Sequence, residues 1–260
     1  MKSPVIGAMA FLIAILLGFA TIAPAGTIIG NVTFRGDAPA PKALKVKTDQ
    51  FCISHAKGEL SDELVVSKAG AIQNVVISLL KVKSNFGLPK ETPVVDQVNC
   101  AYTPHVLAVL TGTTVNIRTS DPTLHNVHAH AKKNDAINWA MPIKDMALPY
   151  KTKASEVVRL TCDVHNWMSA YIVVLDNPYF AVIGAEDKAG NAISASAFRA
   201  SQSKGSYQIE KIPAGKYRVR AWHETLGTAR KQVEVPETGE VKLSFTNEDF
   251  VKKGRKLSKR

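Results

Sequence analysis

The most informative stretch of the sequence is residues 160–174, which read LTCDVHNWMSAYIVV. It places Cys162, His165 and Met168 at intervals of three residues. Runs of alternating or continuous apolar residues, rich in β-branched types, flank these three positions on both sides, as is typical of strands. The stretch therefore predicts a short loop between two strands, and the loop carries a thiol, an imidazole and a thioether.

A second histidine-bearing segment lies upstream, where residues 121–128 read DPTLHNVH just after a strand-like run. One thiolate, two imidazoles and a weak axial thioether form the ligand set of a blue-copper site. The thiolate holds copper in both oxidation states, and the weak axial ligand keeps the geometry between the preferences of Cu(I) and Cu(II). The two segments together predict such a site. Met141 is an alternative to Met168 as the axial ligand.

On these residues the sequence resembles the cupredoxins, most closely the amicyanin and plastocyanin type. The resemblance implies that copper is held by His125, Cys162, His165 and Met168. It implies that Asn126, the residue after the first histidine, donates its backbone N–H to the cysteine sulfur. It also implies an eight-stranded Greek-key sandwich over about residues 26–176, with electrons leaving through His165 near the surface of the loop.

Two cysteines, Cys52 and Cys100, lie outside the motif. Paired as a disulfide they would close a loop of about 49 residues, worth about 4 kcal/mol on the chain-entropy model. Cys162 would then be the single free thiol, and bound copper would protect it. The open alternative is a second metal or redox site built from Cys52 with His55 and Cys100 with His105. A further candidate second site is His128 with His130, which share one face of an extended segment.

The first 25 residues read as a secretory signal peptide. Met1-Lys2 precedes an uncharged apolar run, residues 5–22, and Ala23-Pro24-Ala25 follows as a small-x-small site. We therefore expect an exported protein, periplasmic or extracellular, with no stable membrane span after cleavage and no nucleic-acid partner. An uncleaved N-terminal anchor stays open because the apolar run is somewhat long.

Residues 177–248 resemble the carboxypeptidase regulatory-like family of small prealbumin-type β-sandwiches, on the segment IPAGKY at 212–217. That resemblance implies no peptidase activity. Residues 249–260 form a basic tail, and the last nine residues carry six of the Lys and Arg side chains. The net charge of +11 is therefore concentrated at this end. The predicted fold class is all-β, a cupredoxin sandwich followed by the smaller one.

Several catalytic and cofactor motifs are absent from the 260 residues. No Cys-x-x-Cys-His haem site, hydrolase motif or glycine-rich phosphate loop occurs. We therefore predict an electron carrier with one type 1 copper rather than an enzyme, and a redox partner such as a c-type cytochrome or a dehydrogenase. The alternatives are a copper-binding or copper-delivering protein without electron transfer, and a structural β-sandwich protein of the envelope.

Overall fold

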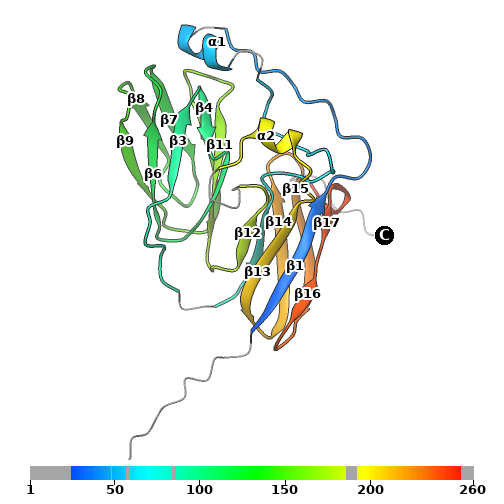
Figure 1. Ribbon diagram of the computed structural model, residues 1–260. Coiled ribbons are helices and arrows are strands. Elements are labelled where there is room, and N and C mark those ends of the chain that lie inside the picture. The colour runs from blue at the N-terminus through cyan, green and yellow to red at the C-terminus, as the bar shows by residue number, and fades with distance from the viewer. Residues whose placement is uncertain (1–24, 48, 57–58, 84–85, 186–191, 253–260) are drawn as a thin grey trace, which may run out of the picture.

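The computed structural model describes residues 25–47, 49–56, 59–83, 86–185 and 192–252. The chain is all-β, as the sequence predicts, and four sheets form two β-sandwiches (Figure 1). The described residues contain two short α-helices, α1 (Gln50–Ala56) and α2 (Ala195–Ala200), and a 3-10 turn, Asn247–Asp249.

The first sandwich, called the site sandwich below, consists of two facing sheets. Their strand orders are β5-β11-β10-β7-β8 and β4-β3-β6-β9. The strands are β3 (Val94–Val98), β4 (Ala101–Thr103), β5 (Val106–Leu110), β6 (Thr114–Thr119), β7 (His125–His130), β8 (Ile137–Met141), β9 (Ala147–Lys151), β10 (Glu156–Thr161) and β11 (Ser169–Leu175).

The core of the site sandwich follows from the period-two alternation of its strands. Val115 and Ile117 of β6 face inward from one sheet, and Val158 and Leu160 of β10 face inward from the other, all of them fully buried. Burying each such side chain contributes about 2 kcal/mol. Because Leu160 is anchored in this core, the loop that begins two residues later starts from a fixed position.

The second sandwich packs the sheet β13-β1-β16, which β17 joins through β1, against the sheet β12-β2-β14-β15. Its strands are β1 (Ala25–Thr33), β2 (Val76–Leu80), β12 (Phe180–Val182), β13 (Ser206–Pro213), β14 (Gly215–His223), β15 (Gly227–Val235), β16 (Glu240–Lys242) and β17 (Phe245–Thr246).

The expected division of the chain at residue 176 differs from the observed strand pairing. We expected residues 26–176 to form one sandwich, but β1 pairs with β13, β16 and β17, and β2 pairs with β12 and β14. Alternation identifies which side chains are buried, but it does not identify the partner of a strand. Both N-terminal strands therefore complete a sandwich whose other strands lie beyond residue 176.

The two sandwiches contact each other through an apolar layer. Val173 and Leu175 of β11 pack with Val76 of β2, and the rings of Tyr171 and Trp222 meet edge to face at 5.3 Å. Beside this layer, His105 of the site sandwich forms a partly buried ion pair with Glu224 of the second.

Two segments differ from their expected conformation. The polar, mixed composition of residues 131–150 predicts a loop, but these residues contain β8 and most of β9. Residues 53–63 have a similar composition, which also predicts a loop, but the helix α1 extends into them. The strands in residues 131–150 carry a weak sequence signal. The strand β8 alternates between half-buried and exposed positions, and only its last residue, Met141, is fully buried.

The predicted signal peptide lies outside the described residues except for Ala25, and so do residues 253–260 of the basic tail. Over the part of the chain that the structure describes, no helix is both long enough and apolar enough to cross a membrane.

Candidate metal centre

The ligand loop, residues 162–168, joins β10 to β11 at one end of the site sandwich. The two strands pair up to Thr161 and Ser169, so the loop starts and ends at adjacent points. Inside it, the Met168 N–H donates to the His165 carbonyl at 2.9 Å, and the Cys162 N–H donates to the Met168 carbonyl at 3.3 Å. These bonds fold the seven residues into a compact turn. Three-residue spacing on such a turn brings the predicted ligands together.

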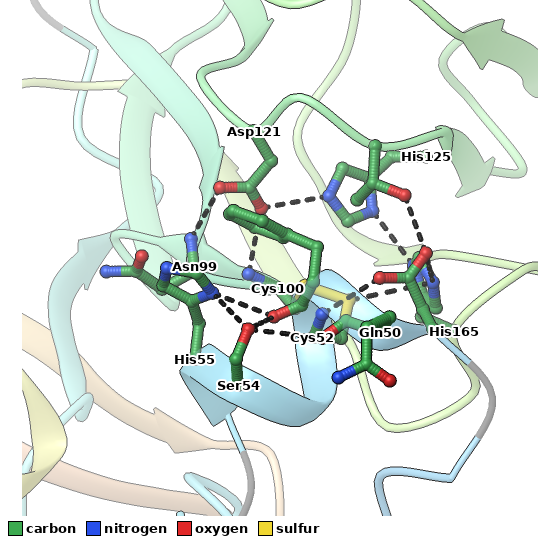
Figure 2. The surroundings of a disulfide bond; sticks show 12 residues. Gln50, Cys52, Ser54, His55, Asn99, Cys100, Asp121, His125 and His165 are labelled. Carbon is green, nitrogen blue, oxygen red and sulfur yellow. Dashed lines mark hydrogen bonds and ion pairs between the residues drawn. A yellow bond between two sulfur atoms is a disulfide. The ribbon is translucent and has the colours of Figure 1, made fainter.

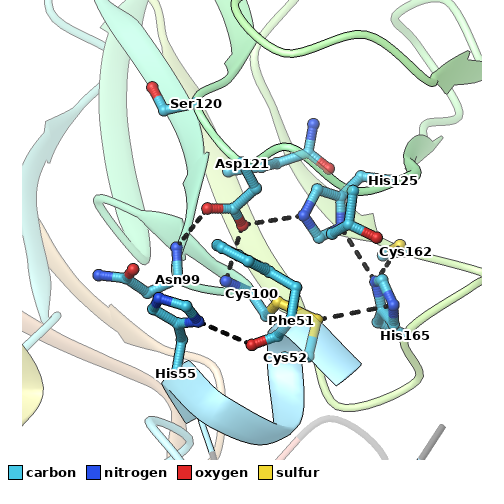
Figure 3. A network of polar contacts seen from close by, with 12 residues as sticks. Phe51, Cys52, His55, Asn99, Cys100, Ser120, Asp121, His125, Cys162 and His165 are labelled. Carbon is cyan, nitrogen blue, oxygen red and sulfur yellow. Dashed lines mark hydrogen bonds and ion pairs between the residues drawn. A yellow bond between two sulfur atoms is a disulfide. The ribbon is translucent and has the colours of Figure 1, made fainter. Parts of the chain in front are cut away.

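Three of the predicted ligands form one buried group. The ligand atoms of His125, Cys162 and His165 all lie within 4.8 Å of one another, and the three residues are at most 2% exposed. The two Nδ1 atoms are 3.0 Å apart, and the Cys162 sulfur is 3.8 Å from His165 Nδ1 (Figure 3). A thiolate and two imidazole nitrogens facing one point fit a soft or borderline metal such as copper.

Asp121 determines which nitrogen of His125 faces the metal position. His125 Nε2 lies 2.9 Å from Asp121 Oδ2, so Nε2 carries an N–H and Nδ1 is the nitrogen that faces the site. Asp121 is itself fixed, because the backbone N–H groups of Asn99 and Cys100 each donate to it at 2.8 Å. A carboxylate behind a ligand histidine is the usual way in which proteins orient a metal ligand.

Asp121 also affects the protonation of His125 and, through His125, that of Cys162. Burial alone would lower the pKa of His125, but the hydrogen bonds to Asp121 and Cys162 raise it to about 9. Burial would raise the pKa of the Cys162 thiol, but a hydrogen bond with His125 and three backbone N–H donors bring it below its ordinary value. Without metal, the pair therefore tends toward imidazolium and thiolate. The thiolate is the form that binds a metal, and the proton on His125 must leave when the metal binds.

Asn126 connects β7 to the ligand loop. Its backbone N–H is one of the donors that lower the pKa of Cys162, which is the contact implied by the cupredoxin resemblance. Its side-chain Oδ1 accepts the Asp163 N–H at 2.5 Å. The hydroxyl of Tyr102 donates to the carbonyls of both Asn126 and Thr161. The side chains of Asn126 and Tyr102 therefore both join the segment that carries His125 to the segment that carries Cys162.

Met168 and Met141 are both buried in the core beside the ligands. Met141 is paired directly with His125 across β7 and β8. Its sulfur, however, accepts a hydrogen bond from Gln97 Nε2 at 2.9 Å. Met168 is fixed through its backbone contacts with Cys162 and His165. The engaged sulfur of Met141 favours Met168 as the axial ligand.

His165 is not at the surface, which corrects the expectation of an exposed loop histidine. It is 1% exposed, because α1 and the disulfide between Cys52 and Cys100 cover it (Figure 2). The Cys52 sulfur lies 3.7 Å from His165 Nε2, and Asp49 Oδ2 lies 3.9 Å from the same atom. Burial is the main reason why the pKa of His165 is lowered, so this imidazole is neutral and able to bind metal.

Residues that sequence reasoning missed, chiefly Asp49 and Asp121, surround this group. Asp49 Oδ1 accepts the Cys52 N–H at 2.8 Å and so caps the start of α1. Only one signal in the sequence pointed to Asp121, namely its position four residues before His125. Nothing in the local sequence of Asp49 links it to the ligand loop.

The other histidines lie outside the ligand group. His128 and His130 stack at 4.0 Å, with His128 bonded to the exposed Asp163. His55 Nδ1 bonds to the Phe51 carbonyl, and His105 bonds to Glu224. Within the described residues, none of these four joins a group of three potential metal ligands. Cys52 and Cys100 form the disulfide rather than a site with His55 and His105.

No protein-family model matches the chain, and no curated protein matches it. Among solved structures, the chain is similar to an amicyanin variant in its Cu(I) state, with 22% identity and a TM-score of 0.30, over 38% of this chain and 98% of the amicyanin. It is also similar to a copper-containing nitrite reductase of Thermus scotoductus SA-01, with 17% identity and a TM-score of 0.30, over 37% of this chain and 25% of the reductase. Both of these structures are copper proteins by their printed names, and each similarity covers less than half of this chain.

Proposed function

We propose that this chain is an exported copper protein that transfers single electrons, with one type 1 copper held by His125, Cys162, His165 and Met168. The observation that carries the proposal is the free, buried thiol of Cys162. It lies in one group with the imidazoles of His125 and His165, whose Nδ1 atoms are 3.0 Å apart. These residues would hold copper, which would supply one-electron redox chemistry when bound. The residues keep the site dry and hold the ligands in place, which limits rearrangement when the charge changes.

The rigidity of the ligand set supports electron transfer. Hydrogen bonds to the backbone fix the ligand loop, and Asp121 fixes the ring of His125. A rigid ligand set that suits both oxidation states favours rapid electron exchange over chemistry on a bound substrate. The partner we propose is a redox protein, such as a c-type cytochrome or a dehydrogenase, in the periplasm or outside the cell.

The test is an absorption and electron-spin-resonance spectrum of the protein loaded with Cu(II). We expect an intense thiolate-to-copper band in the visible range, lost on reduction and restored on oxidation. Cys162→Ala should abolish the band, and the matched control His130→Gln, which changes a nearby histidine outside the ligand group, should keep it. A protein that stays colourless with Cu(II) would contradict the proposal.

A second function, copper binding or delivery without electron transfer, is favoured by the cover over His165. An imidazole that is 1% exposed offers no direct contact to a redox partner. Anaerobic mixing with a c-type cytochrome distinguishes the two functions. Fast, reversible oxidation of the copper protein supports electron transfer. Loss of copper to an acceptor protein, with no change in the cytochrome spectrum, supports delivery.

A further inference from the structure

The disulfide lies next to the candidate copper site rather than in a remote part of the fold. His165 stands between two sulfur centres, with Nδ1 3.8 Å from the Cys162 sulfur and Nε2 3.7 Å from the Cys52 sulfur. Cys52 and Cys100 are 0% exposed, and Cys162 is 2% exposed. All three cysteines of the chain therefore lie in one buried region (Figure 3).

Each disulfide sulfur has its own nitrogen and oxygen neighbours. The ligand atoms of Asp49, Cys52 and His165 lie within 4.8 Å of one another, and so do those of Cys100, Asp121 and His125. A disulfide sulfur is a poor metal ligand, whereas a thiolate is a strong one. The bond between Cys52 and Cys100 therefore determines whether these surroundings can hold a metal.

We propose that Cys52 and Cys100, once reduced, form a second Cu(I) site beside the Cys162 site. A dithiol reductant supplies two electrons and two protons, the S–S bond breaks to give two thiols, and the reductant becomes a disulfide. When Cu(I) binds, each thiol releases its proton and the copper keeps its oxidation state. The proposal extends the proposed copper function, but it uses different sulfur atoms.

The surroundings favour Cu(I) over Zn²⁺. Structural Zn²⁺ takes four ligands, but His125 and His165 already direct their Nδ1 atoms to the Cys162 site. The carboxylates of Asp49 and Asp121 already accept hydrogen bonds from backbone N–H groups, so the two sulfur atoms are the ligands left free for a metal. Two soft thiolates suffice for Cu(I). When Nδ1 of His165 binds metal, its proton is on Nε2, which faces the Cys52 sulfur. That N–H can donate to the thiolate and stabilise its negative charge in the buried site.

The experiment uses the full chain with Cys162→Ala, so that the Cys162 site cannot contribute its thiolate. The variant is compared in its disulfide form and after refolding with a dithiol under nitrogen, and Cu(I) affinity is measured against a coloured Cu(I) chelator. We expect affinity to rise by about a hundredfold or more on reduction, because two thiolate ligands replace none. The matched control, Cys52→Ser/Cys100→Ser/Cys162→Ala, should show no change with reductant.

A measurement of folding excludes binding to an unfolded chain. Cu(I) that binds only the folded, reduced protein must raise its melting temperature. We expect this rise for the reduced Cys162→Ala variant, together with a native near-ultraviolet circular dichroism spectrum, and no rise for the triple variant. The second site would be overturned if reduction left the Cu(I) affinity of the Cys162→Ala variant unchanged and added Cu(I) did not raise the melting temperature of the reduced variant. An equal gain in the triple variant would also overturn it. Absence of a copper band in the unmodified protein would overturn the proposed function alone.

Discussion

The ligand loop and the helix α1 contact the same imidazole, that of His165, but they reach it in different ways. The loop brings Cys162, His165 and Met168 together within seven residues, through its own backbone hydrogen bonds. The helix comes from more than a hundred residues away and is held there by the disulfide and by Asp49. A local cluster of ligands is visible in a sequence, whereas a cover built from distant residues is not. In the proposed copper site, the loop together with His125 of β7 would bind the metal, and the helix would limit access to it.

The largest expected effect comes from removing the link that holds the cover. Cys52→Ala/Cys100→Ala opens the loop closed by the disulfide, whose cysteines are 48 residues apart. The unfolding free energy should fall by about 4 kcal/mol, because the unfolded chain is no longer constrained. Denaturant unfolding followed by circular dichroism measures the loss.

The same variant tests whether the loop and the helix are independent. If the loop and His125 hold the metal without the cover, the folded variant keeps its thiolate-to-copper band while His165 becomes reactive toward a histidine-modifying reagent. Ser54→Ala, a change on α1 that leaves the disulfide intact, is the matched control and should leave His165 protected. Loss of the band in a folded variant would show that the cover is part of the metal site.

The next largest effect is expected from changing Asp121, whose carboxylate is hydrogen-bonded to His125. Asp121→Asn keeps an oxygen that can accept the His125 N–H but removes the charge. Copper affinity should fall by about 10- to 100-fold, the usual cost of changing such a partner. Asp163→Asn changes an exposed carboxylate within the ligand loop and is the control, with affinity close to that of the unmodified protein. Competition with a chelator measures both, and equal losses would show that Asp121 acts only through overall charge.

The sequence predicted the loop and its ligands but not this carboxylate or the burial of His165. Cys162, His165 and Met168 share one turn, so their spacing carries the information. Asp121 owes its position partly to the backbone N–H groups of Asn99 and Cys100, which a linear motif does not show. The all-β class followed from alternation, but the partners of β1 and β2 did not, because pairing depends on contacts between distant strands.

A pH dependence follows from the raised pKa of His125, which is about 9 without metal. Below that pH the imidazole carries a proton that copper must displace, so affinity should rise by about tenfold per pH unit up to about pH 9 and then level off. In Asp121→Asn the pKa of His125 should be lower, so the levelling should begin at lower pH. A chelator titration at several pH values measures the slope. An affinity independent of pH would contradict the protonated state of His125.

The same shift determines how the stability of the metal-free protein depends on pH. The pKa of His125 is raised on folding, so its contribution is fully present below its ordinary pKa of about 6.5 and is lost as pH rises through about 9. In the copper-loaded protein no proton occupies Nδ1, so this loss should disappear. Melting temperatures of both forms across this range measure the difference. Parallel curves would show that His125 contributes nothing to the pH dependence.

The smallest expected effect lies where the helix meets the loop before His125. Thr123 Oγ1 donates to Asp49 Oδ2 at 2.6 Å and so joins the start of α1 to the segment that carries the first ligand. Thr123→Val removes this bond at nearly constant volume, and the unfolding free energy should fall by about 1 kcal/mol. Thr123→Ser keeps the hydroxyl and is the control. Because Asp49 also caps α1, the variant should raise hydrogen exchange at the Cys52 amide more than at the Cys162 amide. Equal increases at both amides would mean that the helix and the loop open as one unit. This result would contradict the view that α1 is a cover separate from the ligand loop.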